Sequence, residues 1–257
     1  KSGRREEVVI LSKCGHPDAM WNKRVNEKEM RKDLKKSLEE LKTDYIDIYM
    51  LHRDDPDTEV AVAVETFIAM QEEGNIGALG ASNWTHTRSE EANEYAYKHN
   101  LIPFSVSSPN FCLARQVEDP WGGGGVKISG SENQEARAWY EKNQMPVIAY
   151  ASLGRGFFSG RMKSEYADHA SNYLDSFAMT GYACSDNFER LRRCEIIAER
   201  HGVTVAQIAM NWIFSHPLNI FAIASMSKAD RMKANREALL LQLSDEEIAY
   251  LDLENPE

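Results

Sequence analysis

The chain has 257 residues, of which 40 are acidic and 30 basic, so its formal net charge at neutral pH is −10. This acidic balance argues against nucleic-acid binding, which needs a basic surface, and no apolar run reaches the roughly 20 residues of a membrane helix. Without a signal-peptide pattern, the chain is expected to be cytoplasmic and to bind neither nucleic acid nor membrane. The four scattered cysteines favour free thiols over a disulfide scaffold.

Short apolar runs alternate with longer amphipathic segments along the chain, which is typical of a parallel sheet with helical crossovers. We expect six strands, at residues 8–12, 45–51, 76–81, 104–107, 147–151 and 220–224. Helical spacing of apolar residues predicts helices at residues 26–42, 58–74, 88–99, 133–143, 187–201 and 204–216, and a terminal helix from residue 244. Residues 60–64 alone would also suit a strand.

Helix starts and loops have their own sequence signals. Capping boxes are expected at Asn26 with Glu29, Thr204 with Gln207 and Ser244 with Glu247. Residues 118–130 include four consecutive glycines and no apolar period, which predicts a long loop, and residues 160–184 are expected to be a second one.

Six strand–helix units favour one of two α/β folds. A doubly wound open sheet is one alternative, but it should have a G-x-G-x-x-G turn after its first strand, and Cys14-Gly15-His16-Pro17 does not supply it. We therefore expect a (β/α)8 TIM-type barrel with its first two β/α units missing, forming a single domain over residues 1–257.

Two polar side chains stand at expected strand ends. Period-two alternation places Ile46, Ile48, Met50 and His52 on one face, so that an imidazole ends the apolar face of a strand. Lys13 follows the first expected strand in the same way. Catalytic groups of barrel enzymes occupy such positions, although a capping histidine and a solvated lysine would fit the pattern as well.

Five segments, in order and in register, resemble motifs of the aldo-keto reductases. Residues 10–13 resemble the family's catalytic-lysine strand and residues 44–56 its histidine strand. Residues 80–84 (Gly-Ala-Ser-Asn-Trp) are similar to its carboxamide-binding segment, residues 150–157 to its Y-S-P-L-G-R-G stretch, and residues 225–235 to its adenosine-phosphate segment. The resemblance implies a (β/α)8 barrel and hydride transfer between a nicotinamide cofactor and a small-molecule carbonyl, such as an aldehyde, a ketone or a sugar-like compound.

The resemblance also implies roles for particular residues. Lys13 would lower the pKa of a catalytic tyrosine, and His52 would donate a hydrogen bond to the carbonyl oxygen. Trp84 and Trp121 are the expected substrate contacts, and no metal site is expected because no histidines have ligand spacing. The implied cofactor-binding residues are Ser82, Asn83, Ser108, Tyr150, Ala151, Ser152, Leu153, Gly154, Arg155, Arg161, Ser225, Ser227, Arg231 and Asn235.

The cofactor preference is expected to depend on Arg231. A guanidinium at this position suits the 2′-phosphate of NADPH and makes NAD the less favoured cofactor. Two positions depart from the family pattern. Ser108 stands where a glutamine is common, and Ala234 stands where a glutamate usually contacts adenine.

The family's catalytic aspartate and tyrosine belong to a unit that precedes the lysine strand, and this sequence has no match for either. We therefore expect the 257 residues alone to show no turnover and to self-associate through open barrel edges, unless an upstream segment completes the barrel. The alternative functions are a non-catalytic cofactor-binding sensor or regulatory module and an inactive fragment. A different barrel enzyme, such as a lyase or an isomerase, fits the five motifs least.

Overall fold

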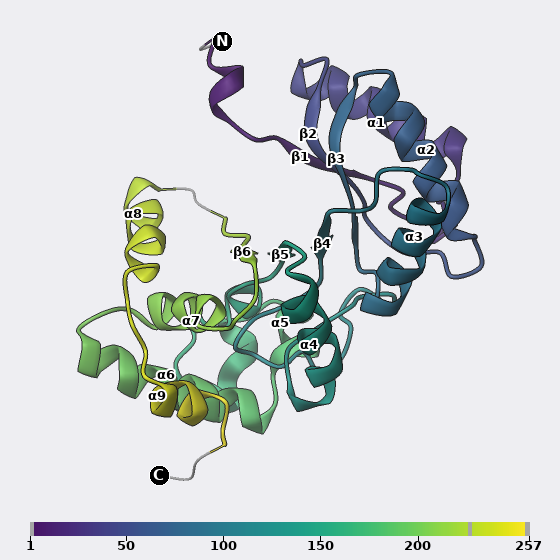
Figure 1. Ribbon diagram of the computed structural model, residues 1–257. Helices are drawn as coiled ribbons and strands as arrows, with labels where there is room; N and C mark the ends of the chain where they lie inside the picture. Colours follow the sequence, from purple (N-terminus) through teal and green to yellow (C-terminus); the bar gives the residue numbers. More distant parts are fainter. Residues whose placement is uncertain (1–2, 226–227, 255–257) are drawn as a thin grey trace. The chain divides into compact units, whose positions relative to one another are not determined.

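A computed structural model describes residues 3–225 and 228–254, which group into two compact units (Figure 1). The N-terminal unit is Lys1–Ser108 and the C-terminal unit is Pro109–Glu257. The expectation of a single domain stays a prediction.

The N-terminal unit is a parallel sheet with helical crossovers. Its strands pair in chain order: β1 (Leu11–Cys14), β2 (Ile46–Leu51), β3 (Ile76–Ser82) and β4 (Val106–Ser108). Its helices are the 3₁₀ helix η1 (Arg5–Glu7) and the α-helices α1 (Glu27–Leu41), α2 (Val60–Glu72) and α3 (His86–Lys98). In Figure 1 the three α-helices lie along one side of β1–β3.

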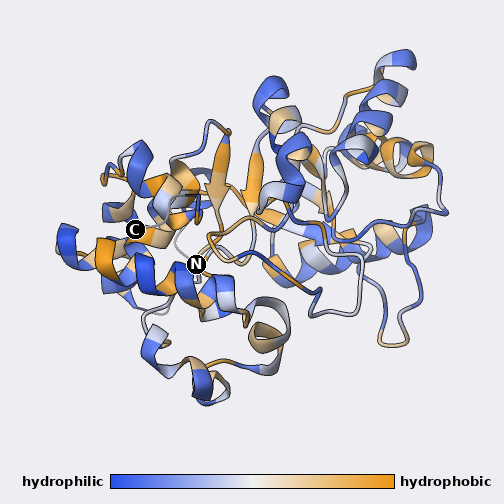
Figure 2. Cartoon of the chain, turned by 90° about the horizontal axis from the view of Figure 1, so that it is seen from below, coloured by the Kyte–Doolittle hydropathy of each residue, from blue (hydrophilic) through white to orange (hydrophobic). Residues whose placement is uncertain are grey.

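Successive side chains of β2 point to opposite faces of the sheet. Tyr49 is fully buried on the helix side, where its ring meets the edge of Phe67 from α2 at 6.0 Å between centroids. Met50 points to the opposite side of the sheet, level with Lys13 of β1 and Gly80 of β3. Figure 2 shows the strands as apolar and the helices as mixed, with hydrophilic outer faces. Ile46 and Met50 on the side opposite the helices are fully buried as well, so both faces of the sheet contribute to the core, and the face with Met50 also presents Lys13.

The C-terminal unit contains one short parallel pair, β5 (Val147–Ala149) with β6 (Ile220–Ala222), and a larger share of helix. Its α-helices are α4 (Gln134–Asn143), α5 (Ser176–Tyr182), α6 (Ser185–His201), α7 (Val205–Phe214), α8 (Ala229–Ala238) and α9 (Asp245–Leu251). Its 3₁₀ helices are η2 (Ser131–Asn133), η3 (Gly154–Gly156) and η4 (Ser164–Asn172).

Most of the expected elements are confirmed. All six predicted strands are present, and residues 60–72 form a helix rather than the alternative strand. The capping boxes at Thr204 and Ser244 both form. At Asn26 only half of the expected box forms, because Glu29 pairs with Arg24 at 2.8 Å while Asn26 still accepts from the Glu29 amide.

The first strand begins three residues later than predicted. Val8 and Val9 were expected in it, but they are 54% and 72% exposed, and pairing with β2 begins at Leu11. The approach segment is held by side chains instead: Arg5 donates to the Val8 carbonyl, and Asp47 accepts from the Ile10 amide at 2.8 Å. As a result Lys13 lies inside β1 rather than after it.

One further expectation needs correction, and one helix was not expected. Residues 160–184 are not a plain loop, since they contain η4 and α5, and α5 is capped by Asp175, whose carboxylate accepts from the Ala178 amide at 2.7 Å. Helix α8 was not predicted, because only Ala238 of its ten residues is buried and no apolar stripe marks it. Residues 118–130 do form the expected irregular loop, with one isolated bridge between Asn110 and Lys127.

Candidate active site

Lys13 and His52 lie at the same edge of the N-terminal sheet. Lys13 stands opposite Met50 in the parallel register of β1 with β2, and His52 follows β2 directly. The His52 amide donates to the Cys14 carbonyl at 2.7 Å, which extends the ladder by one bond. Met50 and His52 are two residues apart, so Lys13, Met50 and His52 project from one side of the sheet. The pairing of two strands thus brings together the two residues that the sequence singled out.

The electrostatics of this pair favour a neutral imidazole. Burial lowers the pKa of Lys13 below its usual value. Burial first, and then the positive charge of Lys13, lower the pKa of His52 to about 4. The His16 ring, at 4.7 Å between centroids, meets the His52 ring edge to face and adds to this effect. At neutral pH His52 therefore carries one N–H and one lone pair, and can act as a hydrogen-bond donor.

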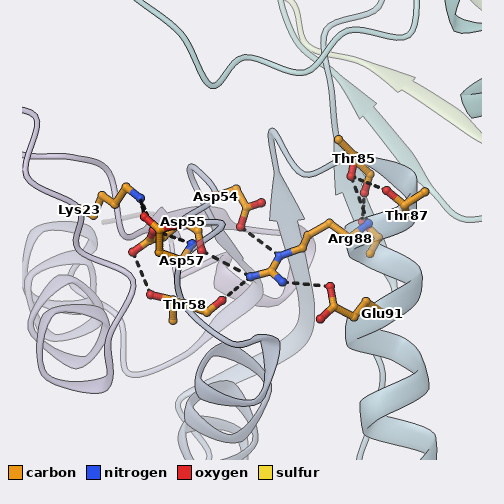
Figure 3. Close-up of polar contacts among 10 residues, drawn as sticks. Lys23, Asp54, Asp55, Asp57, Thr58, Thr85, Thr87, Arg88 and Glu91 are labelled. Atoms are coloured by element: carbon orange, nitrogen blue, oxygen red, sulfur yellow. Dashed lines mark hydrogen bonds and ion pairs between the residues drawn. The ribbon is translucent and has the colours of Figure 1, made fainter.

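The segment after His52 is fixed by a polar network (Figure 3). Arg88 of α3 donates to the Thr58 and Asp55 carbonyls and lies 3.4 Å from the Asp54 carboxylate. Lys23 pairs with the Asp55 carboxylate at 2.6 Å from the other side. The backbone on which His52 sits is thus held from both flanks by cations.

Asn83, which follows β3 directly, contacts the backbone of His52. Its side-chain amide donates to the His52 carbonyl at 3.0 Å, and its backbone amide donates to the Ser108 carbonyl at 3.2 Å. Ser82 donates to the same Ser108 carbonyl at 2.8 Å. Asn83 adopts φ of 59°, a left-handed conformation that asparagine tolerates better than most residues. Asn83 therefore positions His52, a role that the sequence could not show because it depends on contact between strand ends.

Trp84 is buried in this structure, and its contact with a substrate stays a prediction. Its side chain is 1% exposed and packs against Phe104 at 5.5 Å between ring centroids. The Arg88 guanidinium covers its other surface at 5.1 Å from the ring centroid. Trp84 is a core residue that supports Arg88.

In the C-terminal unit, Tyr150 and Trp121 come together. Their rings meet edge to face at 5.9 Å between centroids, although 28 residues separate them. The Tyr150 carbonyl accepts from the Asn110 side chain at 3.1 Å, and the Tyr150 amide donates to the Pro109 carbonyl. The structure thus places a predicted cofactor residue beside a predicted substrate residue.

A tight turn follows Tyr150. Ala151, Gly154, Arg155 and Gly156 all have positive φ, between 53° and 94°. Within this turn the Gly154 amide donates to the Ala151 carbonyl at 2.7 Å. Leu153 lies within this turn, and its carbonyl accepts from the Gly156 amide at 3.0 Å.

Arg155 belongs to this turn and Arg161 lies near it, while the Ser152 side chain has a structural role. Arg155 stacks on Trp121 and Phe177 and pairs with Asp175 at 2.9 Å, while its buried Nε has no hydrogen-bond partner in the described part of the chain. A Cβ on Gly156 would stand 3.3 Å from Arg161 Nη2, so that guanidinium lies over the turn. The Ser152 hydroxyl is buried and donates to the Ile223 carbonyl at 2.9 Å, which makes its side chain a structural one.

The remaining cofactor candidates lie near β6 and α8. Ser225 is exposed after β6, and Arg231 is exposed in the first turn of α8. Asn235 is half-buried four residues later, on the same face of that helix. Ser227 lies outside the described residues.

The sequence matches the model of the Aldo/keto reductase family over residues 1–254. The chain therefore belongs to the aldo-keto reductases, a family of oxidoreductases.

Individual relatives are distant. The chain is 24% identical to aldo-keto reductase str7 of Strobilurus tenacellus, over 97% of this chain and 69% of that protein. It is 26% identical to the methylglyoxal reductase YeaE of Escherichia coli K12, over 99% of this chain and 72% of that protein. For the norsolorinic acid reductase of Aspergillus flavus the identity is 25%, over 98% of this chain and 61% of that protein. The chain thus spans about 61–75% of the length of the curated relatives it matches.

A solved structure gives the fold. The crystal structure of the thermostable aldo-keto reductase Tm1743 with the inhibitor epalrestat superposes with a TM-score of 0.69 at 23% identity, over 98% of this chain and 73% of that one. The expected α/β parallel-sheet fold of the aldo-keto reductase TIM barrel is confirmed, and the open doubly wound sheet is not the fold.

Among the described residues, no group of three or more His, Cys, Asp or Glu side chains is arranged to hold a metal ion. No helix there combines the length and the apolar character that crossing a membrane requires.

Proposed function

We propose that this chain binds NADPH and supplies Lys13 and His52 to a site that reduces a small carbonyl compound. The observation that supports this most is the pair itself: a half-buried ammonium beside a neutral imidazole, at the ends of adjacent parallel strands. An ammonium and a neutral N–H donor together suit an oxygen atom that gains negative charge during a reaction.

The two residues have different tasks in this proposal. His52 donates its N–H to the carbonyl oxygen and orients the substrate. The Lys13 ammonium stabilises the negative charge that develops on that oxygen and lowers the pKa of the acid that protonates it, so that hydride and proton together give the alcohol. NADPH supplies the hydride when it is bound. Asn83 and Arg88 keep the His52 backbone in place through the contacts described above.

Tyr49 is not the proton donor of this site. It neighbours Met50 in β2, but its hydroxyl lies on the helix side of the sheet, beside Ser37 of α1. Burial raises the pKa of Tyr49, which makes the hydroxyl a poorer acid. The donor must therefore be another group.

The C-terminal unit fits a nicotinamide dinucleotide on two observations. The Arg155 Nε, in the turn from Ala151 to Gly156, is a buried donor without a partner in the residues described, and the Arg161 guanidinium lies over the same turn, so that two cations would contact a pyrophosphate. The Tyr150 ring offers a surface for an aromatic cofactor ring. The exposed Arg231 and the half-buried Asn235 of α8 would hold the adenosine phosphate, and Arg231 favours NADPH over NADH.

The substrate class follows from the relatives only in outline. The names of the matched proteins include a methylglyoxal reductase, an aryl-alcohol dehydrogenase and an L-glyceraldehyde 3-phosphate reductase. We infer a small aldehyde or ketone as substrate of this chain.

The test combines binding and turnover. NADPH and NADH are titrated into the 257-residue chain by fluorescence quenching, and the product of the complete open reading frame is assayed with methylglyoxal, an aryl aldehyde and glyceraldehyde 3-phosphate. Tight NADPH binding with reduction of at least one carbonyl supports the proposal. Binding without reduction by the complete product would favour a non-catalytic cofactor-binding module, and failure to bind either nucleotide would refute the proposal.

A further inference from the structure

The C-terminal unit contains a half-enclosed cavity of about 240 Å³ that none of the residues discussed above lines. Its wall comes from the segment after Asn110, the start of α4, the facing sides of α6 and α7, and the segment after α9. The lining residues are Phe111, Leu113, Arg115, Ser129, Gly130, Ser131, Gln134, Arg137, Arg190, Trp212, His216, Asp252 and Glu254. Three of them are arginines, in a protein that has more acidic than basic residues.

None of these arginines forms a salt bridge with a carboxylate in the part of the chain that the structure describes. Arg137 donates to the Ile128 carbonyl at 2.7 Å and to the Gly130 carbonyl at 2.6 Å. Arg190 makes only long contacts, with the Asn187 side chain at 3.4 Å and the Asp252 carbonyl at 3.5 Å. The guanidinium groups of Arg137 and Arg190 therefore donate to uncharged oxygen atoms.

Arg115 is fixed at the cavity through its backbone. Asn187 accepts from the Arg115 amide at 2.9 Å and donates to the Arg115 carbonyl at 2.8 Å. No hydrogen bond from the Arg115 guanidinium occurs among the described residues. This side chain is therefore available to a ligand in the cavity.

The cavity has a local excess of positive charge. Burial lowers the pKa of Arg190 and of Arg137, and the charge of Arg115 adds to the effect on Arg190. Asp252 offsets part of this charge, but burial raises the pKa of its carboxyl to about 6 even though Trp212 donates to it at 3.1 Å. Asp252 and Glu254 are the two carboxylates among the lining residues, so the three guanidinium groups leave one positive charge in excess, which an anion in the cavity would neutralise.

The start of α4 forms part of the same cavity. Ser131 and Gln134 line it and lie in the η2–α4 junction, where the Gln134 amide donates to the Ser131 carbonyl. The partial positive charge of a helix start favours an anion there, in addition to the three guanidinium groups.

We propose that this cavity is a binding site for a small anion with a carboxylate or phosphate group. Forked guanidinium groups match both planar carboxylates and phosphate oxygens. The volume is below the 300–1,000 Å³ typical of pockets for drug-sized ligands, which restricts the ligand to a small molecule or one terminal group. The site does not depend on the proposed reductase function.

Isothermal titration calorimetry tests the site directly. Inorganic phosphate and malonate are titrated separately into the chain at constant ionic strength, so that the two chemistries can be ranked. Arg115→Gln removes the available guanidinium, and Arg200→Gln is the matched control, because Arg200 is exposed at the end of α6 and does not line the cavity. We expect saturable binding of at least one anion, weakened about tenfold or more by Arg115→Gln and unchanged by Arg200→Gln.

A second variant covers the case in which Arg115→Gln does not fold. Ser131→Asp places a carboxylate at the exposed start of η2, beside the cavity, and should abolish anion binding while leaving thermal unfolding nearly unchanged. No saturable heat up to about 10 mM of either anion would overturn the proposal, because affinities weaker than millimolar do not indicate a built site. Equal losses in the Arg115 and Arg200 variants would overturn it as well.

Discussion

The two groups of candidate residues differ in what holds them. Lys13 and His52 of the N-terminal unit are fixed by strand pairing and by the cation network around residues 53–58. The cofactor candidates of the C-terminal unit lie on a left-handed turn and on α8, a helix with one buried residue. The first group stands on paired β-strands and carries charges that are partly buried. The second group stands on a turn with positive φ angles and on a helix whose charges are exposed to solvent.

This difference predicts different responses to substitution. Changes at the first group should alter catalysis, local stability and titration, because the groups there interact through a poorly solvated environment. Changes at the second group should alter nucleotide affinity and preference by smaller amounts, because exposed charges are screened. The five predictions below test that contrast, from the largest effect to the smallest.

Lys13→Met should lower carbonyl reduction by the complete gene product about 10²- to 10³-fold, because it removes a charge that stabilises the developing oxyanion. The affinity for NADPH should change little, since the charge matters mainly in the transition state. Steady-state kinetics and nucleotide titration measure the two effects, with Lys28→Met on the exposed start of α1 as control. A parallel loss of nucleotide affinity would show that Lys13 is not catalytic.

Arg88→Met should lower the free energy of unfolding by about 2 to 4 kcal/mol, because it leaves Asp54 and two backbone carbonyls of the His52 loop without their partner. Arg31→Met is the control, since Arg31 pairs with Glu27 and Glu73 at the surface, where ion pairs contribute about 0 to 1 kcal/mol. Urea denaturation measures both variants. Equal effects would mean that the network does not hold the loop.

Arg231→Ala should reduce the preference for NADPH over NADH by about 1.5 to 3 kcal/mol, the range for hydrogen bonds to charged groups. Fluorescence titration with both nucleotides measures the change. Arg236→Ala removes another exposed arginine of α8 and should leave the preference unchanged. A preference that survives Arg231→Ala would move the phosphate contact to another residue.

His52 should make stability depend on pH. Its pKa is about 4 in the folded chain, through burial first and the Lys13 charge second, and near 6.5 when unfolded. As pH falls from about 6.5 to about 4, the unfolded chain therefore binds the extra proton, and the free energy of unfolding decreases. His52→Gln should flatten this dependence in denaturation curves, and Lys13→Met should raise the pKa of His52 in an NMR titration. An unchanged His52 titration in the Lys13 variant would contradict the assigned interaction.

Ala151→Gly should stabilise the chain by about 0.5 to 1 kcal/mol. Ala151 has φ of 54°, where an alanine side chain is strained and glycine is not, and this relief exceeds the entropy that glycine gains on unfolding. Ala178→Gly within α5 is the control and should destabilise by a similar amount. Thermal unfolding separates the two signs. Destabilisation by Ala151→Gly would mean that the turn conformation carries no strain.

Local patterns in the sequence were sufficient for most of the fold. Period-two alternation around Ile46 and Met50 identified β2 and the side of the sheet on which His52 lies, because that periodicity follows directly from strand geometry. Capping residues such as Thr204 and Ser244 marked helix starts correctly, because the cap bonds are made within four residues. Helix α8 was missed because a helix without a buried stripe has no apolar period to detect.

Some features of the candidate site likewise followed from the sequence, and others required the tertiary structure. The sequence by itself indicated that Lys13 and His52 lie close to the ends of two strands, and it placed the chain in its family through five short motifs. Only the tertiary structure decided that Asn83 holds the His52 carbonyl, that Trp84 is a buried support for Arg88, and that three arginines line one cavity. The physical reason is that a side chain's rotamer, burial and charge partners are set by residues far away in the sequence, whose approach no local pattern records.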